Sequence, residues 1–172
     1  SLAISKLPLE TPDPAADKDI KQTSGVVLFD FTHANQYQPP EVNSLIVGIE
    51  KRGGKVETIT DASLLEYNLK YASAYVVVSP STAFTADEIR IVQDYVKRGG
   101  RLVVFADATR STFNFDFFTG NIINYSDANA LNPLLAPFGV AVKNDYLYNV
   151  KEHEGNFRNV FFDDFGKNEL TF

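Results

Sequence analysis

The chain of 172 residues is 44% hydrophobic and 22% charged, a composition typical of a globular domain with one sizeable core. Its net charge of −6 argues against a nucleic acid or an anionic membrane as the partner, because both attract a basic face. The absence of cysteine excludes thiolate nucleophiles, disulfides and cysteine-bound zinc, and no apolar run reaches the length of a membrane span.

The first two segments of the chain differ in composition. Residues 1–24 mix prolines with charged and small residues without a period of 2 or 3.6, which predicts a linker or an N-terminal arm. Residues 25–31, GVVLFDF, are mainly apolar and rich in valine and phenylalanine. Such a run is typical of a strand that is buried on both faces.

Two helices are predicted by apolar stripes of helical period. The stripes are Val42, Leu45, Ile46 and Ile49 within residues 39–54, and Ile89, Val92 and Val96 within residues 81–100. Pro40 suits the first turn of the first helix, where a missing N–H costs nothing. Thr85 and Glu88 have the spacing of a capping box at the start of the second helix.

Short strands and one further helix complete this part of the chain. Strands are predicted at residues 55–60, 74–79 and 101–106, and a short helix at residues 61–73. Strands that alternate with helices through short turns require a mainly parallel sheet with right-handed crossovers. We therefore predict an α/β fold, a three-layer α/β/α sandwich with helices on both faces of the sheet.

The segment after the fourth predicted strand is aromatic. Phe113, Phe115 and Phe117 alternate along the chain, which favours a β-ribbon with one buried face. The alternative is an exposed aromatic surface for a sugar, a peptide or a partner subunit. The exposure of these side chains distinguishes the two interpretations.

The last part of the chain is predicted to hold a helix and two strands. Pro133 and Pro137 are expected to break a short helix within residues 126–139. The candidate strands are residues 140–143 and 145–150. We expect the domain to end near residue 150, with residues 151–172 as a C-terminal extension that continues beyond Phe172 in the natural protein.

The tetrapeptide KRGG occurs twice, at residues 51–54 and 97–100. Phosphate loops lie where a strand leads into a helix N-terminus, whereas both of these glycine pairs follow a helix. We therefore predict helix C-terminal caps, in which lysine and arginine complement the negative end of the helix dipole.

Polar side chains follow three of the predicted strands. They are Asp30, His33, Asn35 and Tyr37 after the first strand, Ser79, Ser81 and Thr82 after the third, and Asp107, Arg110 and Ser111 after the fourth. Open parallel sheets bind ligands at the carboxyl ends of their strands. With a strand order of 2-1-3-4, these loops are neighbours, and we predict that these ten residues form a ligand-binding surface.

Catalysis by this surface is the alternative hypothesis. His33 could act as a general base oriented by Asp30 or Asp107, with Ser81 or Ser111 as the nucleophile. No GxSxG motif follows any strand, however, and we favour a structural role for His33 in holding its loop.

A metal site is suggested by Glu152, His153 and Glu154 with Asp163 and Asp164 downstream. Adjacent residues of an extended chain point to opposite faces, so three consecutive ligands do not converge on one ion. We therefore interpret this segment as a solvated charged turn, and we predict neither a metal nor another cofactor.

Three segments together resemble a known family. They are VVLFDFTHANQY, YVVVSPSTAFTADEIRIVQDYVKRGGRLVVFAD and NALNPLLAPFGVAVKNDYLYN, within residues 25–150. They are similar to the glutamine-amidotransferase-like domains of gliding-motility-type ABC transport auxiliary proteins and of related uncharacterised membrane proteins. The resemblance implies a flavodoxin-like sheet and an extracytoplasmic domain whose membrane anchor lies outside this chain.

The same resemblance bears on activity. Class I glutamine amidotransferases carry a cysteine nucleophile in an elbow after a sheet strand, and this chain has Asp107 at the corresponding place. A carboxylate does not replace a thiolate in amide attack, so we expect no glutaminase activity.

The leading hypothesis is therefore a non-catalytic binding module of an ABC-transport-associated protein. Its expected partner is a small polar ligand, a glycan or a protein subunit, and neither a nucleic acid nor direct membrane insertion is expected. The alternative function is a hydrolase that uses the Asp/His cluster.

Overall fold

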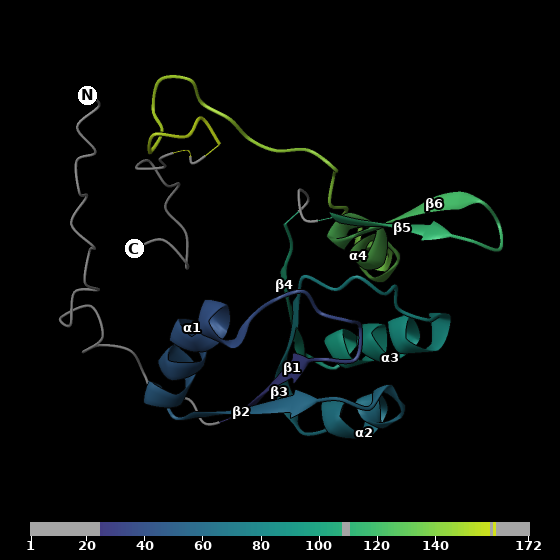
Figure 1. Ribbon diagram of the computed structural model, residues 1–172. Coiled ribbons are helices and arrows are strands. Elements are labelled where there is room, and N and C mark those ends of the chain that lie inside the picture. The colour runs from purple at the N-terminus through teal and green to yellow at the C-terminus, as the bar shows by residue number, and fades with distance from the viewer. Residues whose placement is uncertain (1–24, 108–110, 159, 161–172) are drawn as a thin grey trace.

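The computed structural model describes residues 25–107, 111–158 and 160. Four strands form a parallel sheet in the order β2-β1-β3-β4, and two more form an antiparallel hairpin (Figure 1). The strands are β1 (Gly25–Asp30), β2 (Gly54–Ile59), β3 (Ala72–Val78), β4 (Arg101–Phe105), β5 (Ser111–Asp116) and β6 (Asn121–Ser126). The α-helices are α1 (Pro39–Lys51), α2 (Leu65–Leu69), α3 (Ala86–Lys97) and α4 (Asp127–Leu135).

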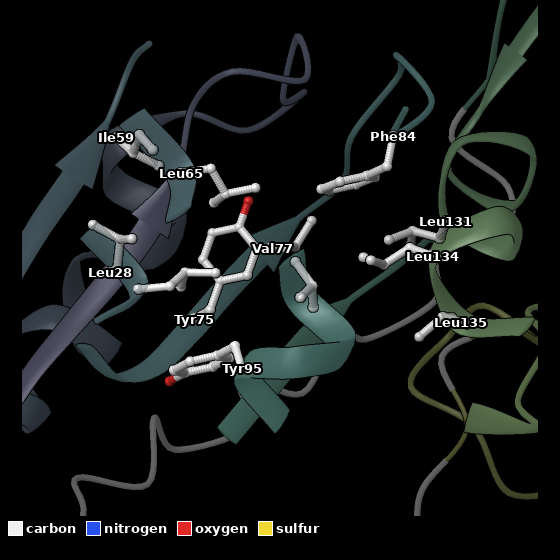
Figure 2. Close-up of a cluster of buried hydrophobic side chains, with 12 residues drawn as sticks. Leu28, Ile59, Leu65, Tyr75, Val77, Phe84, Tyr95, Leu131, Leu134 and Leu135 are labelled. Atoms are coloured by element: carbon white, nitrogen blue, oxygen red, sulfur yellow. The ribbon is translucent and has the colours of Figure 1, made fainter. Parts of the chain in front are cut away.

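Helices cover both faces of the parallel sheet, which confirms the predicted three-layer, flavodoxin-like α/β/α sandwich. Alternate side chains of β3 point to opposite faces, as the period of a strand requires. Val76 packs on the face covered by α1, where it contacts a cluster that includes Val42. Tyr75 and Val77 pack on the other face, among side chains of α2, α3 and α4 (Figure 2).

The predicted ends of the two long helices are confirmed. Pro39 and Pro40 occupy the first turn of α1, and the Thr85 hydroxyl accepts a hydrogen bond from the Glu88 N–H at the start of α3. Gly53 and Gly99, which follow the last helical residues, have φ angles of 84° and 94°. Side chains with a Cβ rarely adopt this left-handed conformation, so the first glycine of each KRGG segment ends a helix.

Two predictions for the end of the domain are wrong. Pro133 lies inside α4 without breaking it, since the helix continues to Leu135. Residues 140–143 and 145–150 form no strands, and most of their side chains are exposed. Apolar alternation is not enough to form a strand where no sheet edge pairs with it.

No helix in the described part of the chain combines the length and the apolar character that crossing a bilayer requires.

Candidate functional site

The loops after β1 and β3 meet at the carboxyl end of the sheet, as the strand order predicts. The Gln36 N–H donates to the Ser79 carbonyl across 2.7 Å. The His33 carbonyl accepts hydrogen bonds from the backbone N–H groups of Ser81, at 3.0 Å, and Thr82, at 3.1 Å. The backbone therefore fastens the two loops together before any side chain contributes.

His33 lies at the centre of this junction, between two carboxylates. Its Nδ1 lies 2.9 Å from Asp30 Oδ2 and 2.8 Å from the Thr32 hydroxyl, and its Nε2 lies 3.5 Å from Glu88 Oε1. The imidazole ring stacks on Phe84 with a centroid separation of 3.6 Å. The ring thus has a polar contact at each nitrogen and an aromatic contact on one face.

The cluster is almost completely removed from solvent. Asp30 is 0% exposed and His33 is 3% exposed. Burial alone raises the pKa of Asp30, but the hydrogen bond and positive charge of His33, with hydrogen bonds from Thr32, outweigh it and lower the pKa. Asp30 therefore remains a buried carboxylate that is stabilised by its neighbours.

Glu88 has two roles, one with each carboxylate oxygen. Oε2 accepts hydrogen bonds from the N–H of Thr85 at 2.7 Å and from its hydroxyl at 2.6 Å, which caps α3, while Oε1 faces His33. Burial raises the pKa of Glu88, yet these hydrogen bonds and the charge of His33 together lower it. Sequence reasoning placed Glu88 at the cap only, because its distance from His33 depends on how α3 packs on the sheet.

The side chains of two other predicted site residues form hydrogen bonds with the backbone of the protein. Asn35 Nδ2 donates to the Val78 carbonyl at 2.9 Å, and Ser81 Oγ donates to the Ala34 carbonyl at 2.9 Å. Ala34 and Ser79 adopt positive φ angles of 48° and 42°, which are uncommon for residues other than glycine. The surrounding hydrogen bonds hold these strained positions.

The predicted residues of the third loop are not brought into this cluster. The Asp107 side chain is exposed, and its backbone N–H donates to Asp127 Oδ2 at 2.8 Å. Ser111 begins β5 by its backbone, and Arg110 lies outside the described residues. Among the ten predicted residues, Asp30 and His33 thus join with Thr32 and Glu88, which the sequence analysis did not select.

An open cleft of about 330 Å³ lies beside this junction, on the face of the sheet that α1 covers. Tyr37, Val42 and Leu45 line one side, and Val78, Ser79 and Phe105 line the other, with Glu41 at the start of α1. The Tyr37 hydroxyl is buried without a hydrogen-bond partner among the described residues. Burial, and then the charge of Asp30, raise the pKa of Tyr37 to about 12, so the phenol keeps its proton.

The aromatic segment after β4 forms the hairpin β5–β6, as the alternating pattern predicts, but its aromatic face is exposed. Phe113 and Phe115 are 66% and 53% exposed, and Phe117 and Phe118 in the turn are 88% and 101% exposed. Phe115 and Phe117 contact each other edge to face at 5.1 Å. The predicted burial of one face is therefore wrong, and the alternative of an exposed aromatic surface fits the structure.

The described residues of the segment considered for metal binding do not form a metal site. His153 forms an isolated antiparallel bridge with Val160, while Glu152 and Glu154 are exposed. Asp163 and Asp164 lie outside the described residues. Within the described ranges, no group of three His, Asp or Glu side chains is placed to hold an ion.

Comparisons with known proteins relate the chain to a sequence family and its fold to solved structures. The sequence model of a family described as "ABC-type uncharacterized transport system" matches residues 31–160. A solved structure titled "mmIFT52 N-terminal domain" matches with a TM-score of 0.54 and 20% sequence identity, over 83% of this chain and 52% of that chain. This chain thus spans about half the length of that structure, and at this identity the likeness concerns the fold alone. The comparison with curated proteins gave no significant match.

Proposed function

This chain belongs to the family of ABC-type uncharacterized transport systems, and we propose that it acts there as a non-catalytic module that binds a protein subunit. The contact surface in this proposal is the carboxyl-end region of the sheet. It consists of the aromatic hairpin β5–β6, which follows β4 in the chain, and of the cleft that α1 and Phe105 line.

The exposure of the hairpin is the observation that carries this proposal. Residues 111–126 contain a single charged residue, Asp116, in a chain that is 22% charged. Aromatic side chains without nearby charge are typical of the buried centre of a protein interface. An isolated two-stranded hairpin is also only marginally stable in water, so burial of its aromatic face against a partner would stabilise it.

The polar residues at the carboxyl end of the sheet support partner binding more than they support hydrolysis. The His33 carbonyl holds the two loops together and its ring contacts Asp30, and both side chains are buried, which does not favour contact with a substrate. Tyr37 and Ser79 line the cleft, and Thr82 and Asp107 are exposed. We propose these four as the polar residues that the partner contacts.

Two finer expectations belong to this proposal. The resemblance to glutamine-amidotransferase-like domains supports an evolutionary relation in which the nucleophile position carries Asp107, without glutaminase activity. The family's association with transport supports a location next to a membrane, and we propose the extracytoplasmic side.

The proposal is tested by binding to the other subunits of the transporter. The full protein is co-expressed with them, and affinity is measured by calorimetry on the purified components. We expect the double substitution Phe117→Ser/Phe118→Ser to weaken binding by about tenfold or more, because exposed aromatic anchors dominate such interfaces.

The matched control is Tyr67→Ser/Tyr71→Ser. These two tyrosines also form an exposed aromatic pair, with centroids 5.5 Å apart, but they lie at α2, away from the hairpin. The control should bind like the wild type. Equal affinity of the hairpin variant and the control would refute the proposed contact surface.

A further inference from the structure

A second cavity lies at the opposite end of the sheet, where the strands begin. It has a volume of about 300 Å³, and its polar lining includes Lys70, Ser73, Tyr95, Arg98 and Arg101. The cations come from three separate places: the end of α2, the end of α3 and the start of β4. The packing of the fold thus brings Lys70 next to two arginines that are close together in the sequence.

The three cations around this cavity have no acidic partner in the described part of the chain. The ion pairs found there involve other basic residues, such as Lys55 with Glu57 and Lys97 with Asp94. Arg98 complements the negative end of the α3 dipole, which is the role predicted for the KRGG segment. Lys70 has the same position at the C-terminal cap of α2, whereas Arg101 belongs to a strand and has no such role.

Tyr95 adds a buried polar group to the same cavity. Its side chain is 3% exposed, and its hydroxyl lies near the backbone N–H of Arg101 without forming a hydrogen bond of full geometry with any described residue. In Figure 2 the hydroxyl of Tyr95 lies at the margin of the apolar cluster and points away from Val77. A buried hydroxyl without a partner costs free energy, and a ligand oxygen in the cavity would remove that cost.

Gly100 keeps this site open. A side chain at Gly100 would collide with the Tyr95 ring, so only glycine allows the backbone to pass against the ring at this point. The second glycine of this KRGG segment therefore has a requirement that helix capping does not explain.

We propose that this cavity binds a phosphate group through Arg98, Arg101 and Lys70, with the hydroxyls of Tyr95 and Ser73 as further donors. Three cations that have no acidic partner among the described residues match the double negative charge of a phosphate monoester better than the single charge of a carboxylate. Arginine provides the planar pair of donors that phosphate oxygens accept. The volume is enough for a phosphate with a small organic substituent.

The site is distinct from the proposed contact surface for a protein subunit. It lies at the amino ends of the strands, and it shares no residue with the hairpin or with the cleft beside Phe105. Substitutions at one site therefore test that site alone.

The experiment measures binding of the full chain to two probes of the same chemistry. Calorimetry with sn-glycerol 3-phosphate reports binding of a free phosphate monoester. Co-sedimentation with vesicles that contain phosphatidic acid, whose headgroup is also a phosphate monoester, compared with phosphatidylcholine vesicles, reports binding of a lipid headgroup. We expect Arg98→Gln and Arg101→Gln each to weaken the binding by about tenfold, because each removes a charged donor. Arg90→Gln is the matched control, since Arg90 is an exposed arginine of α3 that pairs with Asp87.

Tyr95→Phe separates a ligand contact from a structural effect. The substitution removes the hydroxyl and keeps the ring that packs on Gly100. We expect the melting temperature of the unliganded protein to stay the same and the affinity for phosphate to fall. Binding of either probe that depends on Arg98 and Arg101 supports the proposal, and the probe that binds identifies the source of the phosphate. The absence of binding to both probes, or affinities of Arg98→Gln and Arg101→Gln equal to that of Arg90→Gln, would overturn it.

Discussion

His33 connects the loop after β1 to the start of α3 through its two ring nitrogens. The sequence marks this histidine as a candidate general base, because a histidine and an aspartate lie three residues apart after a strand. The structure instead gives it two carboxylate contacts and almost no exposure. A buried imidazole with a polar contact at each ring nitrogen stabilises one arrangement of the loops, since loss of either contact leaves a buried polar atom without a partner.

The two carboxylates of this cluster predict how stability changes in acid. Their folded pKa values lie below the ordinary values of 3.8 for Asp30 and 4.5 for Glu88, so the unfolded chain binds more protons as the pH falls. Their stabilising contribution is complete above the ordinary values and is lost as the pH falls through the folded ones. We expect Glu88→Gln to reduce the slope of unfolding free energy between about pH 5 and pH 3, measured by urea denaturation. Asp87→Asn, an exposed neighbour on α3, should keep the wild-type slope, and an unchanged slope in Glu88→Gln would contradict this prediction.

Helix α3 contributes residues to both the buried cluster around His33 and the basic cavity. Its N-terminus provides Glu88 to the buried cluster, and its C-terminal region provides Tyr95 and Arg98 to the basic cavity. The position of this helix on the sheet is set by apolar contacts of Val92 and Tyr95. Local capping signals predicted where α3 begins and ends, while the contacts of Glu88 required the sheet to be present.

The N-terminal cap of α3 predicts a measurable contribution to the stability of the fold. Thr85→Ala removes the hydroxyl that accepts from the Glu88 N–H and donates to its carboxylate. We expect the free energy of unfolding to fall by about 1 kcal/mol, the usual cost of a lost N-terminal cap. Thr82→Ala is the control, because the Thr82 side chain is exposed and only its backbone N–H contacts His33. Chemical denaturation of both variants measures the difference, and an equal loss in Thr82→Ala would argue against a capping effect.

The whole molecule combines a well-packed sheet with surfaces that have no partner in the described chain. Leu28 and Tyr75 lie in the central strands and are fully buried, whereas Phe113, Phe115 and Ile122 of the hairpin are more than half exposed. Charge is also uneven, because basic residues gather at the amino ends of the strands of a protein with a net charge of −6. The two ends of the sheet thus present different chemistry.

This contrast predicts unequal local stability. Backbone amides in the second halves of β1 and β3 should exchange with solvent deuterium only through global unfolding, because both strands are paired on two sides and these residues are buried. Amides of β5–β6 should exchange faster, since the hairpin has one pairing partner per strand and an exposed face. Hydrogen-exchange mass spectrometry measures both regions in one experiment, and equal protection would show that the hairpin is a part of the cooperative core.

The sequence by itself determined the order and type of the elements from Gly25 to Phe105, because strand composition, helical period and capping residues act over a few neighbouring positions. It also predicted correctly that the loops after β1 and β3 would meet, since that follows from the strand order. Only the tertiary structure decided that Glu88 reaches His33, that the aromatic face of the hairpin is exposed, and that Lys70, Arg98 and Arg101 surround one cavity. Each of these features depends on how segments that are far apart in the chain pack together, and no local sequence pattern specifies that packing.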